Sequence, residues 1–240
     1  MDAGSGLMAV LRSLLFYPIF YFGTLLLVAR AVIAIPAGRA ALRRVVSTWA
    51  RFHRDCCQAL LGIEIIQEGG PLEEPALYAI RHEAYFEAID APALFDLPAV
   101  FAKRELFNLP GWGRAAMAYG LIPVARDGGA SALRTLIREA KRKSAEGRPL
   151  VIFPEGTRVQ HGRRPKLQSG FAGIYKMVGL QVVPVAVNSG PLYHRLWKRS
   201  GQITYRFGEP IPPGLPRGEI EARVEEAINV LNAAGTADGA

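Results

Sequence analysis

A histidine and a carboxylate stand at a spacing that neither a regular helix nor a regular strand brings together. His82 precedes Glu87 by five positions in the stretch AIRHEAYFE, residues 79–87. On a helix this offset turns the two side chains about 140° apart, and on a strand it sends them to opposite faces. The pair therefore has to straddle a turn, which favours a general base with an orienting carboxylate. A solvated surface pair is the alternative when this stretch is taken alone.

A second stretch, VIFPEGTR at residues 151–158, combines a buried strand with a polar turn. Leu150–Phe153 is a run of four apolar residues typical of a buried strand. Proline, acid, glycine, hydroxyl and arginine follow where that strand emerges. A turn of this composition suits an anionic ligand.

Lys103 follows a predicted strand and precedes the turn at Pro110 and Gly111. A lysine in this position can hold a phosphate as a mobile point charge, and an ordinary basic loop is the alternative. Gly111, Gly113 and Ala116 loosely match the dinucleotide-binding fingerprint, but no acid follows at the distance which that site requires. The sequence contains neither a Walker-type phosphate loop nor a G-x-S-x-G elbow, which disfavours P-loop nucleotidases and α/β-hydrolases.

Composition narrows the classes of partner and the compartment. The 240 residues are 50% hydrophobic and carry 29 Lys and Arg against 21 Asp and Glu, a net charge of +8. Such an excess suits nucleic acid, an anionic membrane surface or phosphorylated substrates, and the apolar N-terminus favours the last two. Cys56 and Cys57 are adjacent, so they neither staple distant segments nor offer zinc-ligand spacing. A reducing compartment fits this usage.

The N-terminus carries a long apolar segment. Ser13–Ala29 has no charge, and the apolar run resumes after Arg30 as Ala31–Ala37, with Pro18 and Gly23 as interruptions. We expect a retained membrane anchor that either spans once, with Arg30 snorkelling, or enters and leaves as a helical hairpin. A secretory signal peptide is the competing interpretation, but no convincing cleavage site follows.

The next segment has helical periodicity and two contrasting faces. An apolar side opposite an arginine-rich side is typical of a helix that lies flat on an anionic bilayer. The alternative is a helix that packs on the core with a solvated basic face, and both can hold. The apolar residues are Leu42, Val45, Val46, Trp49, Phe52, Cys56 and Leu60, and the basic ones are Arg39, Arg43, Arg44, Arg51 and Arg54.

From Gly62 onward, short apolar strands alternate with helical stretches, which indicates an α/β fold. We expect one catalytic domain at residues 61–232, with a mixed, mostly parallel sheet flanked by helices. An anchoring segment at residues 1–60 would precede it and a disordered tail at 233–240 would follow. The expected strands are Gly62–Gln67, Leu77–Ile80, Ala99–Ala102, Leu121–Ala125, Leu150–Phe153, Val182–Val187 and Ile203–Phe207. The expected helices are Tyr85–Phe95, Gly113–Tyr119, Ala130–Ala145, Gly170–Val178 and Arg217–Leu231.

Four ordered blocks resemble the glycerolipid acyltransferase family, whose best-known members are the 1-acyl-sn-glycerol-3-phosphate (lysophosphatidic acid) acyltransferases. The blocks are His82–Glu87 for the family's H-x-x-x-x-D box, Lys103–Leu106 with Pro110 and Gly111, Phe153–Arg158, and Val182–Val187. The third block matches letter for letter. Two departures are Glu87, where aspartate is usual, and Arg81, where asparagine is common.

The resemblance implies a role for each matching residue. His82 would take the proton from the acceptor hydroxyl, and Glu87 would orient it. Lys103 and Arg158 would hold the acceptor's phosphate, Glu155 and Gly156 would shape that site, and Pro184 would end a strand beneath it. The implied substrate-binding set is Lys103, Arg104, Gly111, Glu155, Gly156, Thr157 and Arg158. The resemblance implies no metal and no covalent acyl-enzyme.

The implied enzyme transfers a fatty acyl chain to lysophosphatidic acid and gives phosphatidic acid. Its donor would be a thioester of CoA or acyl carrier protein, used as a co-substrate with no other cofactor. It would act on the cytoplasmic face of the inner membrane, against an anionic surface and without nucleic acid. The alternatives are an acyltransferase for another lysolipid, such as a lyso-ornithine lipid, or for glycerol 3-phosphate, and a non-catalytic lipid-binding module.

Overall fold

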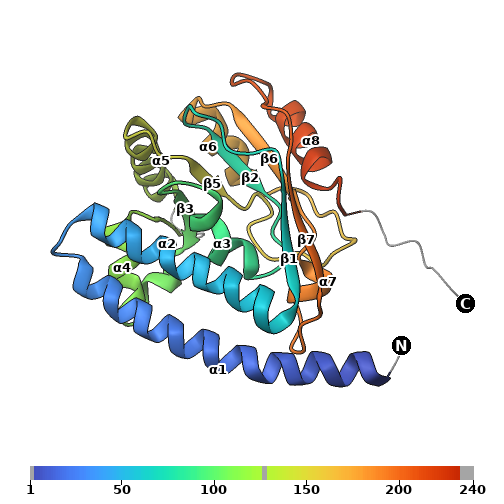
Figure 1. The fold of residues 1–240 in the computed structure, drawn as a ribbon. Coiled ribbons are helices and arrows are strands. Elements are labelled where there is room, and N and C mark those ends of the chain that lie inside the picture. The colour runs from blue at the N-terminus through green and yellow to red at the C-terminus, as the bar shows by residue number, and fades with distance from the viewer. Residues whose placement is uncertain (1–2, 126–128, 233–240) are drawn as a thin grey trace, which may run out of the picture.

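The computed structural model describes residues 3–125 and 129–232. Its elements form three layers, with helices on both faces of one central sheet (Figure 1). The expected disordered tail, 233–240, lies outside the described residues. The helical elements are α1 (Ala3–Ala34), α2 (Arg39–Cys56), the π-helical turn η1 (Cys57–Leu61), α3 (Phe86–Leu94), the 3₁₀ turn η2 (Arg104–Asn108), α4 (Trp112–Tyr119), α5 (Gly129–Ala145), α6 (Ser169–Val178), α7 (Gly190–Tyr193) and α8 (Arg217–Ile228).

The sheet has seven strands in the order β1-β7-β6-β2-β5-β3-β4. All neighbouring strands are parallel except β6 and β7, which confirms the expected mixed, mostly parallel sheet. Each expected strand is present with only its ends shifted. The strands are β1 (Ile63–Glu68), β2 (Leu77–Ile80), β3 (Ala99–Lys103), β4 (Ile122–Val124), β5 (Leu150–Ile152), β6 (Val182–Val187) and β7 (Gly201–Phe207).

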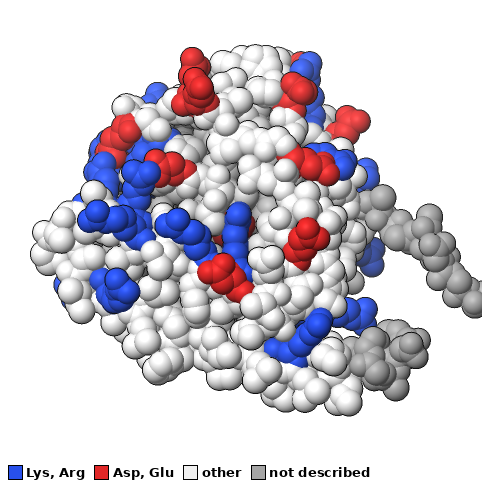
Figure 2. Space-filling view, viewed as in Figure 1, with Lys and Arg blue, Asp and Glu red and all other residues white. Residues whose placement is uncertain are grey.

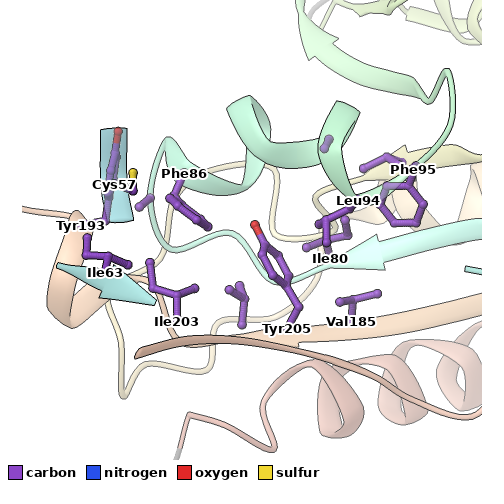
Figure 3. Packing of buried hydrophobic residues seen from close by; sticks show 14 of the residues in the cluster. Cys57, Ile63, Ile80, Phe86, Leu94, Phe95, Val185, Tyr193, Ile203 and Tyr205 are labelled. Carbon is purple, nitrogen blue, oxygen red and sulfur yellow. The ribbon is translucent and has the colours of Figure 1, made fainter. Parts of the chain in front are cut away.

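The residues of β2 alternate between two apolar clusters, because successive side chains in a strand point to opposite faces. Tyr78 and Ile80 pack with α3 and β7, and Leu77 and Ala79 pack with α5, α6 and α8. Figure 3 shows the first cluster, with the Tyr205 ring projecting from β7 toward α3. With both faces covered, β2 is buried along its whole length and forms a rigid base for the residues that follow it.

The N-terminal helix differs from the expected interrupted segment. α1 continues through Pro18 and Gly23, so the apolar run does not fold into a hairpin on itself. α2 packs closely against α1 at Gly23, where an added Cβ would lie 2.4 Å from the Phe52 ring. Gly6–Ala34 is long and apolar enough to cross a membrane, and only 17% of its most apolar window is buried.

α2 packs on the core, which is one of the two interpretations of its amphipathic pattern given above. Leu42, Ala50 and Cys56 are buried. Arg54 points inward and forms a two-pronged ion pair with the buried Asp90 of α3, at 2.7 and 2.9 Å. α2 therefore joins α1 to the body of the molecule.

Candidate active site

His82 lies in the short junction between β2 and α3, at the edge of the sheet where the parallel strands end. The backbone of this junction is fixed on both sides: Arg81 N–H donates to Val185 O at 2.9 Å, and Val159 N–H donates to His82 O at 2.7 Å. α3 begins at Phe86 and places Glu87 in its first turn. The five-residue spacing thus straddles a turn, as the sequence predicts.

The carboxylate of Glu87 folds back onto the imidazole of His82. Glu87 Oε2 lies 3.0 Å from His82 Nδ1 and 3.0 Å from the Ala84 backbone nitrogen. Glu87 Oε1 accepts a hydrogen bond from the hydroxyl of Ser189. The Glu87 side chain is completely buried, so three donors take the place of its lost hydration.

The imidazole itself remains partly open to solvent. Its side chain is 14% exposed, and its ring stacks on Phe153 with centroids 4.2 Å apart. Because Nδ1 donates its proton to Glu87, Nε2 carries the free lone pair. The geometry supplies an oriented base at the rim of a buried carboxylate.

Glu155 sits directly beneath this junction, in the turn after β5. Its Oε1 accepts from the His82 backbone nitrogen at 3.3 Å and lies 3.4 Å from the Arg81 guanidinium. Burial raises the pKa of Glu155 to about 7, against the lowering effect of its hydrogen bonds and of Arg81. Gly156 adopts a φ of 67°, and an added Cβ would lie 2.7 Å from the Gln168 side chain, so the turn requires glycine.

Arg158 lies over the exposed ring of Tyr85, with its guanidinium carbon 3.8 Å from the ring centroid. Tyr85 directly precedes α3, so this contact brings the basic end of the turn to the His82 junction. Partial desolvation lowers the pKa of His194, and the positive charge of Arg158 lowers it further. Arg158 and His194 therefore lie in the same neighbourhood. Thr157, between Gly156 and Arg158, is exposed and lines the adjoining groove.

Lys103, Arg104 and Gly111 lie at or after the end of β3, on the other side of β5 from the His82 junction. Lys103 ends β3, which is separated from β2 by β5 alone, and the register places it level with the residues that follow β2. Lys103 and Arg104 are both exposed. Gly111 directly precedes α4 with a φ of 72°, and its added Cβ would lie 3.2 Å from Val28 of α1, so backbone conformation and helix packing already explain this glycine.

Pro184 and Arg81 occupy positions that sequence reasoning did not foresee. The expectation that Pro184 ends a strand is wrong, because it lies inside β6. The strand that stops there is β7, whose last residue, Phe207, pairs with Val185. Arg81 is fully buried between Glu83 and Glu155, at 3.5 and 3.4 Å. Its side chain is therefore part of the support beneath the site.

Two contributors to the site were missed. Ser189 reaches Glu87 from more than 100 positions along the chain, and Phe153 supplies the stacking surface for His82. The signal for Ser189 was its position two residues after the predicted strand Val182–Val187, at the edge where functional residues of parallel sheets gather. A second pair, His161 Nδ1 and Glu83 Oε1 at 2.9 Å, lies next to the site.

The family model described as Acyltransferase matches residues 60–188. This range contains the four motif blocks His82–Glu87, Lys103–Leu106, Phe153–Arg158 and Val182–Val187. A 1-acyl-sn-glycerol-3-phosphate acyltransferase of Pseudomonas aeruginosa is 28% identical over 92% of this chain and 86% of its own length. An enzyme of the same name from Helicobacter pylori is 28% identical over 60% of this chain and 63% of its own length.

A crystal structure of the 1-acyl-sn-glycerophosphate acyltransferase PlsC from Thermotoga maritima has a similar fold, with a TM-score of 0.74. The match covers 94% of this chain and 98% of that one at 20% identity. It extends over the N-terminal helices as well as the sheet.

Proposed function

The chain belongs to the acyltransferase family, and we propose that it transfers a fatty acyl chain from a thioester donor to the free hydroxyl of lysophosphatidic acid, giving phosphatidic acid. The observation that carries this proposal is the His82–Glu87 pair, with Nδ1 of His82 held 3.0 Å from the carboxylate and the imidazole side chain still 14% exposed. Relatives named for this activity at 28% identity over most of the chain support the choice of acceptor.

The proposed reaction uses His82 as a general base. Nε2 accepts the proton of the acceptor hydroxyl as the oxygen attacks the thioester carbonyl carbon, and Glu87 stabilises the imidazolium that forms. The tetrahedral intermediate collapses with cleavage of the C–S bond. The proton on Nε2 then passes to the departing thiolate, which restores the neutral histidine.

The acceptor's phosphate would be held by the cations at the same edge of the sheet. Arg158 presents a planar two-pronged donor beside the His82 junction, and Lys103 offers a point charge from the end of β3. Arg104, Gly111, Glu155, Gly156 and Thr157 complete the proposed substrate-binding set. This arrangement fixes the hydroxyl by fixing the phosphate attached to the same glycerol.

The lipid acceptor requires access from a membrane, and the N-terminal helix favours membrane association. Large apolar side chains of α1 are exposed along its length, including Phe22 at 64% and Leu25 at 65%. Figure 2 shows that the lower edge of the molecule, where α1 runs, is mostly uncharged. We place the enzyme on the cytoplasmic face of the inner membrane, where α1 enters the bilayer and the basic side chains of α2 meet anionic headgroups. The domain boundary near residue 60 is part of this proposal.

The test is to incubate the purified protein in detergent with a labelled acyl thioester and a panel of acceptors. We expect phosphatidic acid as the main product, with lysophosphatidic acid preferred over lyso-ornithine lipid and glycerol 3-phosphate. Faster transfer to lyso-ornithine lipid or to glycerol 3-phosphate would identify that compound as the acceptor instead. Binding of lysophosphatidic acid without transfer from any donor would contradict the enzyme assignment and favour a lipid-binding module.

A further inference from the structure

A basic groove adjoins the active site on the loop between β5 and α6. It encloses about 530 Å³ and is lined by ten residues, among them Glu155, Thr157, Arg158, Arg163, Arg164 and Lys166. The only carboxylate in this lining is that of Glu155, which is buried and has a pKa raised to about 7. The groove is therefore strongly positive.

The cations of this groove are exposed, and none of them has an acidic partner among the described residues. Within residues 3–125 and 129–232, neither Arg163, Arg164 nor Lys166 has a carboxylate oxygen within 4.0 Å. Elsewhere on the surface several arginines do have such partners, for example Arg217 with Glu221 at 2.9 Å and Arg206 with Glu68. The groove thus retains its charge for an external anion.

The loop that carries these cations is held rigid from below. The buried guanidinium of Arg81 donates to the carbonyl oxygen of Arg163 at 2.6 Å, and Asn232 Nδ2 donates to the same oxygen at 2.9 Å. The hydrogen bond from Val159 N–H to His82 O joins the loop directly to the proposed base. A preorganised backbone distinguishes this groove from a solvated basic segment, because little order remains to be imposed when an anion binds.

The acceptor does not account for all of this positive charge. Lysophosphatidic acid carries one phosphomonoester with a charge of about −1.5 to −2 near neutral pH, which Arg158 and Lys103 can match. Arg163, Arg164 and Lys166 are then left over. The second substrate must bring its thioester carbonyl to His82, and both kinds of thioester donor carry the acyl chain on phosphopantetheine. The donor therefore brings phosphate to the neighbourhood of the groove.

Resting on the acyl transfer proposed above, we infer that the groove of Arg163, Arg164 and Lys166 binds the phosphate groups at the carrier end of the acyl thioester donor. These phosphates belong to phosphopantetheine in acyl carrier protein, and to phosphopantetheine together with the phosphorylated adenosine in CoA. In both donors the groove holds the carrier outside the lipid phase while the acyl chain and thioester lie toward His82.

The test compares donors that differ in phosphate content, using the full-length protein in detergent micelles with lysophosphatidic acid. The variant is Arg163→Gln/Arg164→Gln/Lys166→Gln. Its matched control, Arg134→Gln/Arg138→Gln/Lys141→Gln, removes the same charge from exposed positions of α5. Each enzyme is assayed with acyl-CoA, with acyl carrier protein thioester and with acyl-pantetheine, which lacks phosphate.

The groove variant should raise the donor KM about tenfold with a phosphorylated donor and far less with acyl-pantetheine, because only the former loses charged contacts. The control should stay near wild type. A larger loss with CoA assigns the groove to the nucleotide phosphates, and an equal loss with both carriers assigns it to phosphopantetheine. An unchanged donor KM, an equal loss with acyl-pantetheine, or a rise in acceptor KM alone would overturn the inference. Absence of transfer by the wild-type protein with every donor would instead refute the proposed function.

Discussion

The carboxylate of Glu87 is held from three sides, and each donor comes from a different part of the chain. His82 and the Ala84 backbone come from the junction that precedes α3, and Ser189 comes from the residues that follow β6. All three surround a side chain with no exposed surface. The orientation of the imidazole therefore depends on the carboxylate, and that of the carboxylate depends on the serine.

Ser189→Ala should accordingly lower kcat without much change in acceptor KM. The variant leaves one oxygen of a buried carboxylate without its donor, a loss of about 1.5–3 kcal/mol for a hydrogen bond to a charged group. Where this affects the transition state, kcat falls about tenfold or more. Steady-state kinetics with both substrates give the measurement, and Ser189→Thr, which keeps the hydroxyl, should restore much of the rate.

Equal kinetics for Ser189→Ala and wild type would show that the hydroxyl does not position Glu87. A parallel rise in acceptor KM for the alanine and threonine variants would indicate a general disturbance of the site instead.

The sequence predicts contacts between residues that are close along the chain better than contacts between residues that are far apart. The five-residue offset of His82 and Glu87 is sufficient to require a turn between them, because both regular geometries are known. Ser189 and Phe153 could not be assigned in the same way, since their contacts depend on how β5 and β6 flank β2. The role of Arg81 was also not predictable from the sequence, because only the fold shows that two buried glutamates surround its guanidinium group.

The turn η2 and helix α4 show how an element can place a binding residue. Gly113 of α4 packs against the backbone of η2, and an added Cβ would lie 1.9 Å from the carbonyl oxygen of Phe107. A backbone atom at that distance cannot move aside without moving η2. Because η2 directly follows Lys103 and contains Arg104, its displacement would shift both cations.

Gly113→Ala should therefore lower the free energy of unfolding by about 1–3 kcal/mol, the usual cost of overpacking, and raise the acceptor KM. Gly218→Ala is the matched control, since Gly218 also lies in a helix but has open space around it. This control should be neutral or stabilising by up to about 1 kcal/mol. Denaturant unfolding in detergent and acceptor kinetics provide the two readouts. Wild-type stability of Gly113→Ala would show that the backbone of η2 can move to accommodate the added methyl group at little cost.

Most elements were predictable because their apolar periodicity is strong, and the strands differ from expectation only at their ends. The continuity of α1 was not predictable, because Pro18 and Gly23 are ordinary helix breakers in isolation. Close packing of α1 on α2 outweighs that local preference. The turns η2 and α7 are short and were missed, since a few residues carry no periodic signal.

At the scale of the whole molecule, α1 is the feature that connects the enzyme with its lipid substrate. Its exposed face carries Phe22, Leu25 and Leu26, and no other described element has so many exposed large apolar side chains. Its opposite face supplies Phe16 and Phe20 to the core of the sheet. The same helix therefore contributes to the fold and to membrane attachment.

Phe22→Glu/Leu25→Glu/Leu26→Glu should shift the protein from the vesicle pellet to the supernatant at high salt, where surface electrostatics are screened. Each change removes apolar burial and adds a charge that costs about 2.5–3.5 kcal/mol in the middle of a bilayer. The control, Leu133→Glu/Met177→Glu/Val230→Glu, makes the same changes at exposed positions outside α1. Vesicle sedimentation separates the two. Equal sedimentation of both variants with wild type would contradict attachment through this face.

The most direct test of the proposed chemistry is the rate of acyl transfer by His82→Ala. Its imidazole is at the open rim of the site, so the variant should fold and keep its affinity for lysophosphatidic acid. We expect a loss of about 10² to 10⁴ in kcat, the range for a positioned proton acceptor. Glu87→Gln should also slow turnover severely. Transfer at the wild-type rate by folded His82→Ala, checked by circular dichroism, would contradict the role of His82 as general base and leave the His82–Glu87 contact a structural pair.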